Sequence, residues 1–459
     1  MEEKGRKAAP APGSKAWERY GDDPRREAAV EGLMDFVTRC KTERETVRHL
    51  EGRLREEGFG PLEAPGPKGV FLNWKDRALA AYRSGRKPLG AGVRLVAAHA
   101  DSPRIDLKPR PLYEDGGLLM GDGHYYGGLK KYQWVNLPLA LHGEVHRTDG
   151  TTVRLALGED PSDPVLLVPD LAPHLDREQE NRKASETVTG ENLDALLGHR
   201  PRTGEEKDPV KAAVLALLEE RYGFGEEDLT SSDLALVPAG PARRVGVDGA
   251  LVGAYGLDDR VCVFCGFEAF LEARDLPRGA VFLALDREEI GSEGVGGAQG
   301  ALLELFLGEL LGREGCGSVL DLRRCLAASE ALSADVTEGG NPLYKESFDP
   351  RQTPRPGDGP AMMKVTGQRG KYDASEARGE FVARVRRALE GENVPWQTGS
   401  LGRVDKGGGG TVAKYLSRSG MDVLDLGPAL LSMHAPYELV STADVLASRE
   451  AYRAFYEGD

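Results

Sequence analysis

The sequence predicts an α/β fold, with a mixed β-sheet flanked by helices and a β-rich domain inserted into it. Short apolar runs end in charge and glycine, as buried parallel strands do, and residues 280–285 (AVFLAL) are an example. Other stretches carry apolar residues at helical spacing, for example within residues 18–57. From about residue 103 the chain becomes rich in Gly and Pro, and short or alternating apolar runs follow. This change in character indicates a second domain.

The N-terminal part divides into a head and a helical stretch. We expect residues 1–17, MEEKGRKAAPAPGSKAW, to form a flexible head, since they contain no hydrophobic signal core. Residues 18–57 include AVEGLMDFVTRC and are expected to be helical. An apolar strand then ends at His99. These segments begin a discontinuous principal domain, which we expect to comprise residues 18–104 and 245–459.

Residues 105–244 are expected to form the inserted domain. TTVRLALG (151–158) and PVLLVPDL (164–171) indicate strands, and the polar segment 175–207 indicates a long loop. DPVKAAVLALLEERYGF (208–224) predicts an amphipathic helix that opens at Asp-Pro. The chain is expected to return to the principal sheet near Val245.

Composition restricts the class of protein. The chain has 459 residues, with 74 acidic and 60 basic side chains and a net charge of −14, which argues against a nucleic-acid surface. No apolar run approaches the roughly 20 residues of a membrane helix. Five cysteines without a signal segment suggest reduced thiols, so we expect a cytoplasmic protein. Cys262 and Cys265 form a C-x-x-C, but their helical, apolar context favours a buried face over a redox pair or zinc knuckle.

Side chains that can bind metal follow several of the apolar runs. An acidic pair alone is more often a solvated turn, and a lone histidine is more often structural. Together, however, carboxylates and imidazoles near a core need a partner, and a metal pair would satisfy several of them at once. Such nitrogen and oxygen ligands suit zinc, manganese or cobalt. The candidates are His99, Asp101, Asp258, Asp259, Glu288, Glu289, Asp335 and His434.

The segments around these residues carry a family resemblance. In chain order they are HADSPRIDLKPRP, YGGLKKYQWVNLPLALHGEV, YGLDDRV, DREEIGSEG, LSADVTEGGNP and LDLGPALLSMHAPYE. From His99 to Glu438 the chain resembles the aspartyl aminopeptidase and vacuolar aminopeptidase I family of two-metal exopeptidases, in a divergent bacterial branch. The resemblance implies a zinc exopeptidase-like fold, in which residues 105–244 form the dimerisation domain and the remainder forms the catalytic metallopeptidase domain.

Two segments depart from the usual family pattern. WVNLPLAL, from Trp134 to Leu141, stands where better-known members carry W-(F/L)-D-R-(D/P)-L. ADVTEGGNPLY lacks the histidines that usually follow the metal-binding aspartate. These differences bear on substrate preference, whereas the positions of the metal ligands are intact.

The resemblance also implies a ligand set for two divalent ions per subunit, which zinc, cobalt or manganese would suit. His99 and Asp335 would hold one ion, Glu289 and His434 the other, and Asp258 would bridge them. The peptide bond between Asp258 and the next residue is expected to be cis.

The same resemblance assigns catalytic roles to three residues. Asp101 would accept the free ring N–H of His99, which fixes the tautomer. Glu288 would be the general base that takes a proton from a water between the metals. His174, in APHLDREQ, would reach into the active site of a neighbouring subunit, since members of the family assemble into large homo-oligomers, typically dodecamers.

Two further segments are expected to line the substrate pocket. KVTGQRGKYDASEA contributes a lysine and a tyrosine, and VDKGGGGTVAKYL contributes glycines whose backbone can approach a substrate closely. The residues assigned to substrate binding are Lys371, Tyr372, Gly409, Gly410 and Thr411.

We therefore expect a metal-dependent aminopeptidase that removes N-terminal amino acids from peptides. One alternative is a related two-metal amidohydrolase, either a deacylase or a carboxypeptidase. Another is a non-catalytic scaffold descended from the peptidase, which the complete set of ligands and Glu288 argue against.

Overall fold

The computed structural model describes residues 13–458, and its largest element is a nine-stranded sheet. Strands β4, β13, β14 and β20 are paired in parallel at its centre, whereas β3 pairs antiparallel with β13 and β16 pairs antiparallel with β20. The sheet is therefore mixed, as the sequence predicts. Its order is β1 (Phe59–Pro61), β2 (Gly69–Trp74), β3 (Ala78–Arg83), β13 (Gly279–Leu285), β4 (Val93–His99), β14 (Glu330–Ser333), β20 (Asp422–Gly427), β16 (Ala361–Met363) and β18 (Gln397–Thr398).

Helices cover both faces of this sheet. Alternate residues of its strands point to opposite sides, so each face packs against its own set of helices. On β4, Val96 and Ala98 belong to one hydrophobic core, and Leu95 and Ala97 belong to another. The first core includes side chains of α2 (Pro24–Arg39), α3 (Glu43–Glu56), α5 (Leu257–Glu272), α8 (Gly379–Gly391) and α10 (Thr442–Glu457). The second includes side chains of α6 (Leu302–Arg313), α7 (Val319–Ala328) and α9 (Ala413–Leu416).

The N-terminal helices form where the sequence predicts them. A short helix, α1 (Lys15–Tyr20), packs on α10, so the last residues of the expected head are helical; residues 1–12 lie outside the described part. Helix α3 begins with a capping box between Thr42 and Glu45, which satisfies backbone N–H groups at its first turn. Cys262 and Cys265 are buried in α5, as the predicted apolar face requires.

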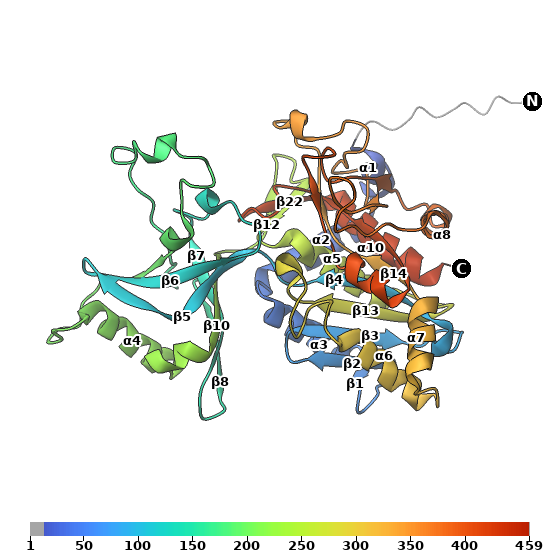
Figure 1. Ribbon diagram of the computed structural model, residues 1–459, viewed down its shortest axis with the longest axis horizontal. Coiled ribbons are helices and arrows are strands. Elements are labelled where there is room, and N and C mark those ends of the chain that lie inside the picture. The colour runs from blue at the N-terminus through green and yellow to red at the C-terminus, as the bar shows by residue number, and fades with distance from the viewer. Residues whose placement is uncertain (1–12, 459) are drawn as a thin grey trace, which may run out of the picture.

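A separate six-stranded sheet carries the β-rich insertion and stands to one side of the layered unit (Figure 1). Its order is β8 (Thr152–Leu157), β7 (Leu139–His146), β10 (Ser232–Pro238), β5 (Arg104–Asp115), β6 (Leu118–Tyr126) and β9 (Ala195–Gly198). Strand β8 confirms one prediction, and α4 (Pro209–Tyr222) confirms the helix of another. The predicted amphipathic character of α4 is not borne out, because Val210 is its only buried residue. The prediction of a strand at 164–171 is wrong, because the only β-pairing in this stretch consists of isolated bridges at Leu166 and Leu167. Pro164 and Pro169, which bracket this stretch, have no N–H to donate.

A five-stranded sheet joins the two larger ones, and the sequence did not predict it. It consists of β11 (Arg243–Val245), β12 (Leu251–Ala254), β22 (Glu438–Ser441), β21 (Ala429–Leu431) and β15 (Thr337–Glu338). The chain therefore passes through this sheet near residue 245, before it returns to the nine-stranded sheet at β13. Two loops also pair through β17 (Gly367–Gln368) and β19 (Gly408–Gly409).

Short 3-10 turns complete the connections. They are η1 (Leu89–Ala91), η2 (Lys131–Gln133), η3 (Gln179–Asn181), η4 (Gly190–Asn192), η5 (Glu226–Ser231), η6 (Glu288–Ile290), η7 (Lys345–Ser347) and η8 (Ser417–Ser419). None of the helices within residues 13–458 has the length and apolar character that crossing a membrane requires.

Candidate metal centre

The predicted ligands converge at the carboxyl ends of the central parallel strands. His99 is the last residue of β4, the acidic pair follows β13 in η6, and Asp335 follows β14. Because these strands are parallel and adjacent, the residues that follow them emerge at one edge of the sheet. Asp258 enters from the start of α5, and His434 enters from the segment after β21.

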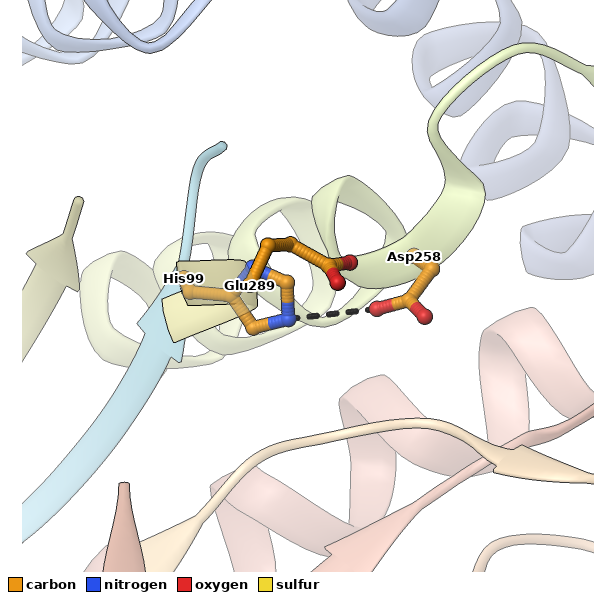
Figure 2. Close-up of side chains that lie close together, drawn as sticks. All are labelled: His99, Asp258 and Glu289. Atoms are coloured by element: carbon orange, nitrogen blue, oxygen red, sulfur yellow. Dashed lines mark ion pairs between the residues drawn. The ribbon is translucent and has the colours of Figure 1, made fainter. Parts of the chain in front are cut away.

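The Asp258 carboxylate lies between two imidazoles. Its Oδ1 is 3.1 Å from Nε2 of His99, and its Oδ2 is 3.3 Å from Nε2 of His434. On the His434 side, Oε2 of Glu289 is 3.4 Å from the same Nε2. Figure 2 shows the side chains of His99, Asp258 and Glu289 directed toward one another, with the contact between His99 and Asp258 dashed. This arrangement gives each imidazole its own carboxylate neighbours and lets both share Asp258.

On the His99 side, two carboxylates stand at a greater distance. Oδ1 of Asp335 and Oε2 of Glu288 are each 4.0 Å from Nε2 of His99. Potential ligand atoms of His99, Asp258 and Glu289 all lie within 4.8 Å of one another, and so do those of His99, Asp259 and Asp335. The resemblance assigned Asp259 only a place in a cis peptide bond, whereas its carboxylate also lies close to His99 and Asp335. That peptide bond is cis, as expected.

Asp101 organises the acidic pair through the backbone. Its Oδ1 accepts the N–H of Glu288 and its Oδ2 accepts the N–H of Glu289, each at 3.2 Å. Toward His99, the carbonyl oxygen of Asp101 lies 3.0 Å from Nδ1 and makes the hydrogen bond, whereas the carboxylate oxygen stands at 3.4 Å. Asp101 thus faces the predicted ring nitrogen with two acceptors, of which the carbonyl is the nearer.

Glu438 fixes the backbone on the His434 side of the centre, as Asp101 does for the acidic pair. We did not predict this role from the sequence. Its Oε1 accepts the backbone N–H of His434 at 2.7 Å, and its Oε2 accepts the N–H of Asp258 at 2.9 Å. His434 has a φ of 63°, in the left-handed region that costs non-glycine residues about 1–3 kcal/mol. The hydrogen bond from Glu438 helps to hold this backbone. The only signal in the sequence is a glutamate four residues after the histidine, which does not distinguish it from a surface group.

The electrostatics of the centre follow from packing carboxylates together out of water. Burial raises the pKa of Glu288 to about 7, and the nearby carboxylates of Asp101 and Asp258 act in the same direction. Burial also raises the pKa of Glu289 and of Asp335 well above their ordinary values. For Asp258, hydrogen bonds with His434 and His99 outweigh burial and lower the pKa.

The pKa values of the two imidazoles are also raised, but by the carboxylates beside them and not by burial. Burial alone would lower their pKa values, but the adjoining carboxylates outweigh it: contacts with Asp101 and Asp258 raise the pKa of His99 well above its ordinary value. Contacts with Asp258 and Glu289 raise that of His434 to about 10. Protonated imidazoles therefore offset part of the negative charge, and a bound cation can take over that role.

This donor set fits divalent cations. Oε1 of Glu289 is buried and receives no hydrogen bond within the described residues. His434 directs Nδ1 to the carbonyl oxygen of Gly128 at 2.7 Å, which leaves Nε2 free to face the carboxylates. A ring nitrogen fixed by a backbone acceptor, with the other nitrogen toward carboxylates, is the arrangement that metal-binding histidines adopt.

A cavity of about 630 Å³ opens from the candidate ligands toward the loops joined by β17 and β19. Lys371, Gly409, Gly410 and Thr411 line it, as does Asp425. The Thr411 hydroxyl donates a short hydrogen bond to the Asp425 carboxylate, whose pKa burial raises to about 6. Apart from the candidate metal ligands, the lining is formed mainly by loops, together with the buried carboxyl group of Asp425.

Two of the residues assigned to substrate binding have other surroundings. Nζ of Lys371 lies 3.0 Å from both carboxylate oxygens of Glu376, so its charge is already paired. Tyr372 is 72% exposed and is not among the residues that line the cavity. His174 lies on an exposed loop and does not line the cavity of its own chain.

Comparisons with known proteins identify relatives over almost the whole chain. A family model described as aminopeptidase I zinc metalloprotease (M18) matches residues 36–456. The chain is 46% identical over 431 residues to the probable M18 family aminopeptidase 1 of Thermotoga neapolitana, covering 92% of this chain and 94% of the relative. The crystal structure of an M18 family aminopeptidase from Thermotoga maritima superimposes with a TM-score of 0.94 at 42% sequence identity, covering 98% and 100% of the two chains.

A more distant structure shares the fold. The mApe1 dodecamer of S. cerevesiae superimposes with a TM-score of 0.75 at 21% identity, covering 94% of this chain and 97% of that one.

Proposed function

The chain belongs to the M18 family of aminopeptidase I zinc metalloproteases, hydrolases that act on peptide bonds, and we propose that its aminopeptidase chemistry takes place at the centre around Asp258. The observation that carries the proposal is the Asp258 carboxylate, which faces Nε2 of His99 with one oxygen and Nε2 of His434 with the other. A carboxylate placed between two imidazoles is suited to bridge two cations.

We assign the ligands on this geometry. His99 and Asp335 would hold one ion, Glu289 and His434 would hold the other, and Asp258 would serve both. We propose that both ions are zinc, although cobalt or manganese would suit the same donors. When bound, such cations polarise a carbonyl group and lower the pKa of water toward neutrality.

Glu288 is the proposed general base. Its carboxylate stands 4.0 Å from Nε2 of His99, beside the shared carboxylate, and burial holds its pKa at about 7. A carboxylate at that position can take a proton from water and return it to the leaving amine. Asp101 assists by fixing the backbone N–H groups of Glu288 and its neighbour Glu289.

The cavity beside the centre is the proposed substrate site. Carboxylates near the ions recognise the free α-amino group of a peptide, and the loop with Gly409, Gly410 and Thr411 binds its backbone. We propose that Lys371 and Tyr372 contact the substrate at the edge of the cavity. A substrate side chain would have to compete with Glu376 for the charge of Lys371. Peptides with a free N-terminus are therefore the proposed substrates.

Assembly forms part of the proposal. We propose that residues 105–244 are a dimerisation domain within a homo-oligomer, a dodecamer by likeness to the family. The exposed loop of His174 suits a residue that serves the active site of a neighbouring subunit. A cytoplasmic location is proposed as well, and the free state of all five cysteines supports a reducing compartment.

The test is hydrolysis of unblocked aminoacyl-p-nitroanilides and short peptides by metal-stripped enzyme re-supplied with Zn²⁺, Co²⁺ or Mn²⁺. Release of the N-terminal residue that depends on added metal supports the proposal and identifies the preferred ion. N-acetylated versions of the same peptides should remain intact. Cleavage of those blocked peptides instead would indicate a deacylase, release from the C-terminus would indicate a carboxypeptidase, and no turnover with metal bound would indicate a scaffold.

A further inference from the structure

The segment that ends β6, Tyr126 to Gly128, runs from the six-stranded sheet directly into the metal centre. Tyr126 is the last residue of that strand and is only 8% exposed. Its hydroxyl donates a 2.8 Å hydrogen bond to Oδ2 of Asp101. A residue of the inserted sheet therefore contacts a carboxylate whose other partners all belong to the centre.

The Asp101 carboxylate also accepts hydrogen bonds from the backbone of the acidic pair. The oxygen that accepts the Tyr126 hydroxyl also accepts the N–H of Glu289, and the other oxygen accepts the N–H of Glu288. Asp101 is completely buried, so water cannot replace a missing donor without entering the core. The orientation of one carboxylate thus fixes the backbone of both the proposed general base and a proposed ligand.

The two glycines that follow let the same segment reach both sides of the centre. A Cβ added at Gly127 would stand 3.3 Å from Cβ of Glu289, and Gly127 has a φ of +74°. A Cβ added at Gly128 would stand 3.3 Å from Nδ1 of His434, the atom that contacts the Gly128 carbonyl. Side chains at these positions would push the ligands away, which accounts for the Y-G-G sequence.

Tyr126 is itself held firmly. The guanidinium of Arg104, its cross-strand neighbour on β5, lies 4.3 Å from the ring centroid. Arg104 in turn donates a 2.9 Å hydrogen bond to Glu43 at the start of α3. The phenol is thus fixed between the inserted sheet and the helical layer of the principal domain.

We propose that Tyr126 is a positioning residue, whose hydroxyl orients Asp101 so that Glu288 and Glu289 keep the geometry that the reaction needs. Through Tyr126 the inserted sheet, besides any role in assembly, forms part of the catalytic centre. The inference rests on the proposed function, because it presupposes that Glu288 and Glu289 do the chemistry and hold metal there.

The test compares Tyr126→Phe with Tyr125→Phe in the full-length, metal-loaded enzyme. The Tyr126→Phe substitution keeps the ring and its stacking on Arg104 and removes only the hydroxyl. Tyr125, the preceding residue on the strand, is 41% exposed and provides a matched control. Loss of a group that orients metal ligands typically costs roughly 10- to 100-fold in affinity or activity. We expect Tyr126→Phe to lower kcat by that factor with KM unchanged, and Tyr125→Phe to behave as wild type.

A second readout does not depend on turnover. Titration of the metal-stripped variants with Co²⁺, followed by visible absorption, should show weaker binding for Tyr126→Phe, while its thermal unfolding stays close to that of wild type. Tyr126→Leu, which also removes the ring, tests the alternative of simple packing. If Tyr126→Phe matches wild type in kcat and Co²⁺ binding and only Tyr126→Leu is impaired, the positioning role is wrong. Absence of activity in the wild type itself would instead contradict the proposed function.

Discussion

The Glu438 carboxylate accepts the backbone N–H of His434 at 2.7 Å, and with its other oxygen it ties the same segment to the start of α5 through the N–H of Asp258. Asp101 makes the equivalent pair of contacts to Glu288 and Glu289. Two buried carboxylates that do not line the cavity thus hold the backbone of four residues of the centre. The positions of the candidate ligands therefore depend on these backbone contacts.

Glu438→Gln is expected to weaken metal binding. The amide NH₂ would face one of the two backbone N–H groups that the carboxylate now accepts, so one donor is left buried without an acceptor. Loss of such a partner costs about 1–3 kcal/mol in stability, and roughly 10- to 100-fold in metal affinity is expected for a group that orients ligands.

Zinc affinity measured by competition with a chelator, together with thermal unfolding, checks this. Glu293→Gln, at an exposed glutamate on the segment after η6, is the control. Wild-type affinity in Glu438→Gln would show that His434 and Asp258 are held by other means.

His142 links the inserted sheet to α3 and predicts a pH dependence of stability. Its Nδ1 lies 2.8 Å from Glu45 and its Nε2 lies 3.0 Å from Glu159, which also accepts Nζ of Lys41. Burial would lower the pKa of His142, but the two carboxylates outweigh it and raise that pKa. The stabilisation is therefore complete below the unfolded value of about 6.5 and is lost as pH rises through the raised folded value.

His142→Gln should accordingly lower the free energy of unfolding by about 1–3 kcal/mol near pH 6, since a charged, buried hydrogen-bond partner is lost. The difference from wild type should shrink as pH rises, because wild-type His142 then loses its proton. Denaturant unfolding of both proteins across this range measures it. A difference that stays constant with pH would show that His142 is neutral in the folded protein.

The sequence allowed the candidate ligands to be singled out because the patterns around them are local. His99 and Glu289 follow short apolar runs, and strands of that kind end at a shared edge of a parallel sheet. Glu438 and Tyr126 could not be predicted in the same way, because their roles depend on backbone N–H groups and carboxylates far away in the chain. The five-stranded sheet was missed for a related reason: its strands have two to four residues each, too few to show a periodicity.

A mixed oligomer tests the proposed role of His174. If His174 serves a neighbouring site, a protomer with His174→Phe keeps Glu288, and a protomer with Glu288→Gln can supply the missing histidine. Each variant alone should be nearly inactive, and co-assembled variants should regain activity. The measurement is kcat per metal-loaded site after the two are co-expressed. No recovery in proven mixed oligomers would place His174 outside the chemistry or within its own subunit's site.

Thr411→Val should weaken substrate binding. The Thr411 hydroxyl anchors its loop on Asp425, a carboxyl held 2% exposed beneath the cavity. Loss of a hydrogen bond to a charged group costs about 1.5 kcal/mol, or roughly tenfold. We expect KM to rise by about that factor, with a smaller change in kcat, and steady-state kinetics on a favoured peptide measures both. Thr398→Val, at an exposed threonine outside the cavity, is the control. An unchanged KM in Thr411→Val would mean that the loop of Thr411 is positioned independently of Asp425.

The most direct test of the central claim is turnover by Glu288→Gln with its metal content measured on the same sample, beside Glu293→Gln. A positioned general base contributes about 10²- to 10⁴-fold, so kcat should fall by that factor while the bound metal matches that of wild type. Glu293→Gln should be fully active. Normal turnover by metal-loaded Glu288→Gln would contradict the account, because the water would then lose its proton to some other group.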